Sequence, residues 1–254
     1  MRILLSNDDG IYAPGLRAMY RELARRAEVD VVAPDSVQSG GSHAITIRHP
    51  VLWRSVRVGD NFQGTSVEGT PADCVKLALN ALLPEKPDLV VSGINSGLNT
   101  GIHVLYSGTV AVAIEAAIQG CPAVSVSFEL YRDMDFEAAA VIAGRLIDRI
   151  VENGPKPGQV FNINIPELKP GWPRGVRVMA QSTQPYEEQI ERRADPYGRE
   201  YYWLSGDFQN IGDETDTDRY AVGQGYVCVT PLQFNMTCSA ELRELKEWNW
   251  PDID

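Results

Sequence analysis

Two adjacent carboxylates near the N-terminus, Asp8 and Asp9, are the first residues whose chemistry needs explaining. They follow the apolar residues 3–5, and like charges side by side require a positive partner. Ligands of open parallel sheets bind outside the carboxyl ends of the strands, where this pair is expected. Neighbouring side chains of a strand point to opposite faces, so both carboxylates reach one ion only if the chain turns, which Gly10 permits. Alternatively, one aspartate caps a helix beginning near Pro14 and the other is solvated.

Two polar loops follow other predicted strands. The loop after the second strand contains Ser39 and Gly40, a hydroxyl and an open backbone that can approach a ligand. The loop after residues 87–93 contains Asn95 and Asn99, which offer neutral amide oxygens. It matches neither the dinucleotide fingerprint nor the phosphate-loop pattern. Taken alone, each segment is as typical of an ordinary surface loop as of a ligand-binding loop.

A third polar segment precedes the apolar helix predicted over residues 111–119. Ser107, Gly108 and Thr109 bring hydroxyls and backbone amides to the start of that helix. Helix N-termini bind phosphate readily, because their first amides are unpaired and the helix dipole is positive there. The other interpretation is that Ser107 or Thr109 simply caps the helix, and the two roles are compatible.

These segments together supply only oxygen ligands, which suit Mg²⁺ or Mn²⁺ and not zinc. The predicted ligands of one divalent ion per subunit are Asp8, Asp9, Ser39 and Asn95. Phosphoester hydrolysis fits such a site, since the ion polarises a phosphoryl oxygen and activates water. Asp8, Asp9 and Asn95 are the candidate catalytic residues. The predicted phosphate-binding residues are Gly40, Asn99, Ser107, Gly108 and Thr109.

The elements that must position these residues alternate between strands and helices. Strands are predicted over residues 2–6, 29–33, 44–47, 51–58, 63–67, 87–93, 123–127, 160–165 and 226–230. Helices are predicted over residues 14–27, 111–119, 136–150 and 241–248, with another opened by residues 70–73 as a structural cap. Such alternation predicts an α/β fold, a mostly parallel sheet with helices on both faces. Residues 44–67 are expected to form an antiparallel excursion from it.

The alternation stops near residue 170, so we expect one domain over residues 1–254 with a core to about 170 and an arm over 171–254. Residues 186–203 mix aromatic residues with arginines, including Tyr186, Tyr197 and Trp203. This composition predicts a projecting β-hairpin that packs on another subunit, with a hairpin folded onto its own domain as the competitor. The acidic run at residues 213–218 is expected to be a solvated loop.

Composition restricts the class of protein. Of 254 residues, 44% are hydrophobic and 22% charged, as in an ordinary globular protein. The net charge of −11 disfavours nucleic-acid polymers as partners, because binding them requires a basic surface. No apolar stretch suggests a membrane span or signal peptide, so a cytoplasmic location is expected. The four cysteines form no CxxC pair, which suggests neither a zinc site nor a disulfide framework.

Several motifs, in order along the chain, resemble those of the SurE family of survival-protein phosphatases, also called 5'/3'-nucleotidases. They are residues 6–10 (SNDDG), 38–40 (QSG), 69–75 (GTPADCV), 92–95 (SGIN), 106–110 (YSGTV), 162–166 (NINIP), 195–199 (DPYGR) and 229–232 (VTPL). The resemblance implies a divalent-metal-dependent phosphatase acting on nucleoside monophosphates and sometimes on short polyphosphate. It also implies a Rossmann-like core and a C-terminal arm exchanged between subunits of a homodimer or homotetramer. The resemblance places the metal on Asp8, Asp9, Ser39 and Asn95.

Two departures from the family concern the substrate pocket. His103 stands where an acidic or amide residue is expected, and residues 111–113 are more apolar than usual. His43 and His103 are candidate proton carriers, although a lone loop histidine is more often a surface or packing residue. Either Asp8 or a metal-activated water is the nucleophile, and water is the better one.

Two other functions compete with phosphatase activity. A regulatory protein would bind nucleotide and metal without turnover. A nicotinamide-dependent oxidoreductase is disfavoured, because carboxylates at the end of the first strand would repel a pyrophosphate and the glycine fingerprint is missing.

Overall fold

Strand β1 (Arg2–Ser6) lies inside the sheet and is buried on both faces. In the computed structural model, which describes residues 1–59, 62–207 and 214–253, Ile3 and Leu5 belong to one apolar cluster and Leu4 to another. Strands β2 (Glu28–Pro34) and β5 (Leu89–Ser96) flank β1, and both run parallel to it. A strand enclosed by parallel neighbours and by helices on both faces has a continuous apolar sequence.

The sheet has nine strands in the order β3-β4-β2-β1-β5-β6-β7-β11-β8. The remaining strands are β3 (Leu52–Val58), β4 (Phe62–Glu68), β6 (Ala123–Phe128), β7 (Val160–Ile165), β8 (Val176–Val178) and β11 (Val227–Leu232). Pairing from β4 through β7 is parallel, whereas β3 is antiparallel to β4 and β11 is antiparallel to β7. The mostly parallel sheet is therefore confirmed, with its antiparallel pairs towards the two ends.

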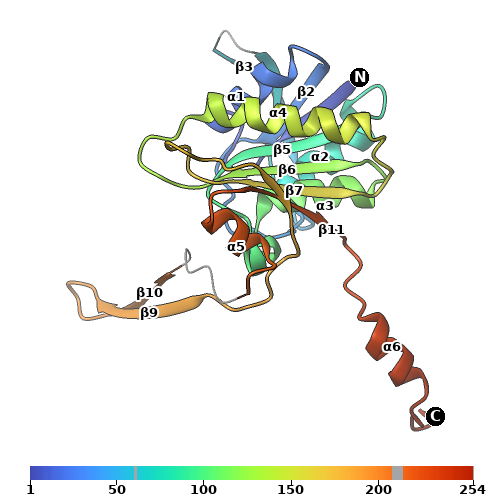
Figure 1. Cartoon of the computed structure of the whole chain (residues 1–254), viewed down its shortest axis with the longest axis vertical. Helices are drawn as coiled ribbons and strands as arrows, with labels where there is room; N and C mark the ends of the chain where they lie inside the picture. The colour runs from blue at the N-terminus through green and yellow to red at the C-terminus, as the bar shows by residue number, and fades with distance from the viewer. Residues whose placement is uncertain (60–61, 208–213, 254) are drawn as a thin grey trace.

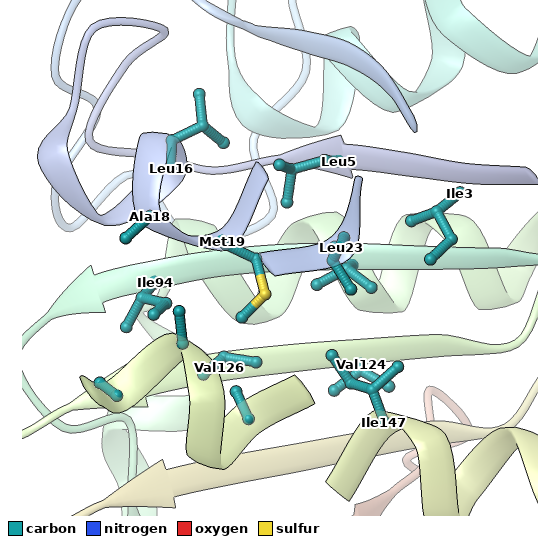
Figure 2. Packing of buried hydrophobic residues seen from close by; sticks show 14 of the residues in the cluster. Ile3, Leu5, Leu16, Ala18, Met19, Leu23, Ile94, Val124, Val126 and Ile147 are labelled. Carbon is teal, nitrogen blue, oxygen red and sulfur yellow. The ribbon is translucent and has the colours of Figure 1, made fainter. Parts of the chain in front are cut away.

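Helices cover both faces, as predicted (Figure 1). Helices α1 (Pro14–Leu23) and α4 (Phe136–Glu152) lie on one face, and Figure 2 shows side chains of α1 such as Met19 among those of the strands. Helices α2 (Pro71–Leu77) and α3 (Gly108–Ile118) lie on the other face. The carboxyl ends of the parallel strands consequently meet the N-terminus of α3 at one rim of the sheet.

The C-terminal part adds smaller elements. They are the hairpin of β9 (Glu187–Ala194) and β10 (Glu200–Asp207), helix α5 (Asp218–Gly223) and helix α6 (Ser239–Lys246). Two further turns are the π-helical η1 (Ala78–Leu82) and the 3-10 η2 (Gly101–Leu105). Figure 1 shows the hairpin and α6 extending away from the sheet. Residues 233–253 are all exposed.

The structure refines or corrects the predictions for several segments. Residues 44–47 form no strand, because the backbone amide of Thr46 bonds to the Asp73 carboxylate instead of to a neighbouring strand. Strands β3 and β4 pair antiparallel, as predicted for residues 51–67, and β4 also joins the main sheet beside β2. The first helix ends at Leu23, four residues earlier than predicted. Asp218 is buried rather than solvated.

Among residues 1–59, 62–207 and 214–253, no helix has the length and apolar composition that crossing a bilayer requires.

Candidate active site

The carboxylate of Asp8 lies against the N-terminus of α3. Asp8 is only 4% exposed, and the hydroxyl of buried Thr109 donates a hydrogen bond to its Oδ1. Gly108 makes this approach possible, because a Cβ at that position would lie 2.7 Å from the Cβ of Asp8 and 2.9 Å from its Oδ2. The first strand and the third helix therefore meet at one carboxylate.

Burial dominates the electrostatics of the two aspartates. It raises the pKa of Asp8 to about 6; the Thr109 hydrogen bond opposes this shift and the charge of Asp9 adds to it. Burial also raises the pKa of Asp9, which is half-buried and accepts a 3.3 Å hydrogen bond from the Ser96 amide. In the described part of the chain, no lysine, arginine or histidine forms an ion pair with either carboxylate. Two adjacent carboxylates, one of them buried and neither ion-paired, fit a bound cation.

Asn95 lies at the end of β5 and not in the loop predicted from the sequence. Its amide nitrogen donates a 2.8 Å hydrogen bond to the Gly97 carbonyl, which leaves the amide oxygen as an acceptor for a ligand. The next residue, Ser96, is the one that bonds to Asp9, so the ends of β1 and β5 are in contact. The turn after β1 also forms as predicted, with Gly10 at a φ of 93°.

Ser39 and Gly40 lie at the exposed apex of the loop after β2. Just before them, the Gln38 amide donates a 2.8 Å hydrogen bond to the Asp8 carbonyl. Gly40 has a φ of 71°, and no atom lies within 4 Å of the Cβ that it lacks. The apex thus begins one residue after a direct hydrogen bond to Asp8, and its outer side is exposed.

The start of α3 has a capping hydroxyl and unpaired backbone amides, the two features expected from the sequence. Ser107 caps the helix, because its hydroxyl accepts a 3.1 Å hydrogen bond from the Val110 amide. The amides of Gly108 and Thr109 belong to the first helical turn, where no carbonyl of the same helix can accept from them. The hydroxyl of Thr109 points to Asp8, so a phosphate would meet the backbone of this residue rather than its side chain.

Asn99 is a buried hub of hydrogen bonds. Its side-chain nitrogen donates to Ser127 at 2.8 Å and its backbone amide donates to Asn164 at 2.8 Å. Its carbonyl accepts from the amide groups of Asn162 and Asn164. These bonds tie the loop after β5 to β6 and β7, so Asn99 holds the rim in place through four hydrogen bonds.

Residues far along the chain, missed by the sequence analysis, support the same loop. The carboxylate of Asp218 accepts hydrogen bonds from the amides of Gly101, at 2.8 Å, and Ser182, at 3.0 Å. The hydroxyl of Tyr186 donates to the Thr100 carbonyl at 2.9 Å, and its ring stacks on His103 with centroids 3.9 Å apart. Tyr186 is thus buried in the body and not part of the projecting hairpin. The one sequence signal for Asp218 is its place at the start of a short helix.

Comparison with known proteins agrees with this geometry. The family model described as survival protein SurE matches residues 3–188. A protein of Christiangramia forsetii named 5'-nucleotidase SurE is 43% identical, and the alignment covers 98% of this chain and 97% of that protein. One of the same name from Rhodopirellula baltica is 46% identical over 98% of this chain and 99% of its own length.

The fold is similar to that of a solved structure as well. The crystal structure of the SurE protein from Aquifex aeolicus superposes with a TM-score of 0.84 at 36% sequence identity, covering 97% of this chain and 98% of that one. Full-length similarity in sequence and in fold, together with the matching family model, leads to one conclusion: the chain belongs to the SurE family of survival proteins.

Proposed function

We propose that the protein is a phosphatase that hydrolyses nucleoside 5'-monophosphates with the help of one divalent cation. The observation that carries the proposal is the pair of buried Asp8 and half-buried Asp9, with Asp8 against the N-terminus of α3 and no ion-pair partner for either carboxylate among the described residues. The relatives in Christiangramia forsetii and Rhodopirellula baltica are named 5'-nucleotidases.

The donor set fits a hard cation. Carboxylate oxygens of Asp8 and Asp9, the amide oxygen of Asn95 and the hydroxyl of Ser39 would hold Mg²⁺ or Mn²⁺. When bound, such an ion polarises a phosphoryl oxygen and lowers the pKa of a water molecule. The other oxygen of Asp8 stays oriented by Thr109.

The protein's own groups would bind and orient the phosphate. The amides of Gly108 and Thr109, at the positive end of α3, offset its negative charge, and the open backbone of Gly40 approaches it from the opposite loop. Asn99 and Ser107 act by holding the two segments that surround it. We favour water over Asp8 as the nucleophile, because the Thr109 hydrogen bond stabilises the carboxylate of Asp8 and so makes it less nucleophilic.

The test is an assay of the full chain on a panel of substrates with Mg²⁺, Mn²⁺ or chelator. We expect release of phosphate from nucleoside 5'-monophosphates, abolished by chelator and reduced more than about 1,000-fold by Asp8→Asn or Asp9→Asn. Asp133→Asn, at an exposed loop carboxylate, is the matched control and keeps full activity. Nucleotide binding without turnover under every metal would support a regulatory protein instead. The 3'-monophosphates and short polyphosphate are secondary substrates in the proposal, measured in the same panel.

We further propose a homodimer or homotetramer in which the C-terminal arm is exchanged. Residues 233–253 are exposed in this chain, including the apolar side chains of Leu242, Leu245 and Trp248, and helices with such side chains require a partner surface. A pocket of about 580 Å³, lined by apolar residues of α3 and by Phe234 and Met236, lies at the root of the arm. Light scattering after truncation at residue 232 is expected to give a smaller species; an unchanged mass would contradict the exchange.

A further inference from the structure

The loop between β2 and β3 is held on both sides of an open apex. On its N-terminal side, the Gln38 amide bonds to the Asp8 carbonyl at 2.8 Å. On its C-terminal side, the Ser42 amide bonds to the Tyr106 carbonyl at 3.0 Å and the Ser42 hydroxyl to the Leu105 carbonyl at 2.7 Å. Residues 39–41 between these anchors are exposed. The loop is therefore an arch with fixed ends, and the apex contains the proposed ligand Ser39.

Hydrogen bonds to the buried Glu115 hold the arch just beyond Ser42. Glu115 of α3 is 2% exposed; its Oε2 lies 2.8 Å from His43 Nε2 and its Oε1 lies 2.8 Å from Lys76 Nζ. Gln119 donates a further hydrogen bond of 3.1 Å to Oε1. Burial alone would raise the pKa of Glu115, but the hydrogen bonds from His43, Lys76 and Gln119 lower it to about 2. The carboxylate is thus charged, and its hydrogen bond to the loop comes from His43.

The cap of α2 supplies a second anchor for the same stretch. Thr70 and Asp73 form a capping box, in which each side chain bonds to the backbone of the other. The same two side chains also hold the loop: the Thr70 hydroxyl donates to the Ala44 carbonyl at 2.8 Å, and Asp73 accepts from the Thr46 amide at 3.0 Å. The segment containing residues 70–73, assigned above to helix capping alone, therefore also positions the arch.

The position of His43 argues against a role as proton carrier. Its Nε2 is bonded to Glu115, which lies seven residues after Gly108 along α3. At 1.5 Å per residue, this places the contact about 10 Å along the helix from the end that meets Asp8. A general acid or base must come within hydrogen-bond distance of the reacting group, directly or through one water.

We propose that His43, supported by Glu115 and Lys76, is a positioning residue that holds the apex of the loop, and with it Ser39 and Gly40, against the Asp8–Asp9 pair. The predicted effect on metal and phosphate binding rests on the proposed function, whereas the hydrogen bonds that hold the loop are independent of it. Loss of His43 lets the apex move away from the aspartates, which weakens the binding of metal and phosphate and leaves the chemical step intact.

The test compares His43→Ala, His43→Gln and the matched control His49→Ala, since His49 is an exposed histidine of the same loop. For His43→Ala we expect the Mn²⁺ concentration for half-activation and KM to rise about tenfold, with kcat at saturation changed less than about threefold. His43→Gln, whose amide can still donate to Glu115, should recover most of the loss. His49→Ala should behave as the wild type.

Two measurements test the role of His43 without an activity assay. They therefore remain valid even if the protein does not hydrolyse nucleotides. Deuterium uptake by the amides of residues 38–46 should be faster in metal-free His43→Ala than in the wild type, and calorimetry should give weaker Mn²⁺ binding. Unchanged uptake and affinity would overturn the proposal. A lower kcat with unchanged KM and a shifted pH profile would also overturn it, because that result assigns proton transfer to His43. If His43→Ala does not fold, Lys76→Met, which removes another donor to Glu115, is expected to give the same changes at smaller amplitude.

Discussion

The hydroxyl of Thr109 donates a hydrogen bond to Asp8 Oδ1, and 101 residues of sequence separate the two. The bond joins the end of the first strand to the first turn of α3. It leaves Asp8 one oriented oxygen for a ligand and opposes the rise of its pKa. The geometry of the aspartate pair therefore depends on a residue that is itself fully buried.

Replacing Thr109 by valine tests this dependence. Thr109→Val keeps the shape but removes the donor, which should cost about 1 to 1.5 kcal/mol of stabilisation of the charged carboxylate. We expect kcat/KM to fall about tenfold, and the pKa of Asp8 in the metal-free protein to rise further. Thr109→Ser retains the hydroxyl and serves as the control. Equal activity of the valine and serine variants would contradict the assigned role.

The raised pKa of Asp8 makes the metal-free protein less stable as the pH rises. In the folded protein the pKa is about 6 against 3.8 for the free side chain, so the folded state keeps a proton that the unfolded chain has lost. The free energy of unfolding should fall by about 3 kcal/mol between about pH 4 and pH 6 through this residue. Urea unfolding of the wild type and Asp8→Asn, in chelator, isolates the contribution. A variant with the same pH dependence as the wild type would refute it.

The same titration predicts competition between protons and metal. Below about pH 6 the proton on Asp8 must leave before a cation binds, so the apparent affinity for Mn²⁺ should fall up to tenfold per pH unit. Calorimetric titrations at several pH values measure it. An affinity independent of pH between 5 and 7 is incompatible with Asp8 as a ligand.

Glu115 contributes stability with the opposite sign. Its folded pKa of about 2 lies below the ordinary glutamate value of 4.5, so its contribution is complete above about pH 4.5 and is lost as the pH falls towards 2. Glu115→Gln should destabilise the protein at pH 7 by about 1 to 3 kcal/mol, because the carboxylate that accepts hydrogen bonds from His43 and Lys76 is lost. The free energy of unfolding of this variant should also depend less on pH between about 2 and 4.5 than that of the wild type. Glu152→Gln, at an exposed residue of α4, is the control.

Asn99 should affect stability as well as activity. Asn99→Ala removes the bond to Ser127 and leaves a buried hydroxyl with one partner fewer, which costs about 1 to 3 kcal/mol. A residue that served only as a phosphate ligand would change KM without changing the free energy of unfolding. Urea unfolding alongside the nucleotide assay separates these outcomes.

Local sequence patterns predicted the body of the fold because their signals are strong and short in range. The apolar run of residues 3–5 marks the enclosed strand, and the Thr70 to Asp73 segment forms the capping box that its residue types indicate. The start of α3 is also as expected, with Ser107 as the cap. In each case the residues that decide the structure are neighbours in sequence.

Contacts between distant segments were not predictable in the same way. Asp218 looks like part of a solvated acidic run, yet it is buried by η2 and bonds to amides 36 and 117 residues away. Residues 44–47 alternate like a strand, but their backbone forms hydrogen bonds with the side chains of Thr70 and Asp73 at the start of α2. The hydrogen bond between His43 and Glu115 joins residues 72 apart. Such pairings depend on how whole helices and strands pack together, which the hydrophobic periodicity of a single segment does not predict.

The helical glycines limit how this enzyme can be engineered for heat resistance. Replacing glycine by alanine inside helices is a standard way to raise thermal tolerance, since alanine restricts the unfolded chain. Here an added methyl group would lie 2.0 Å from the Ile94 carbonyl oxygen at Gly15, 2.7 Å from the Asp8 Cβ at Gly108, and 2.8 Å from a Glu22 carboxylate oxygen at Gly144. Stabilising libraries should therefore leave these three positions fixed and draw their substitutions from the solvent-facing sides of the helices.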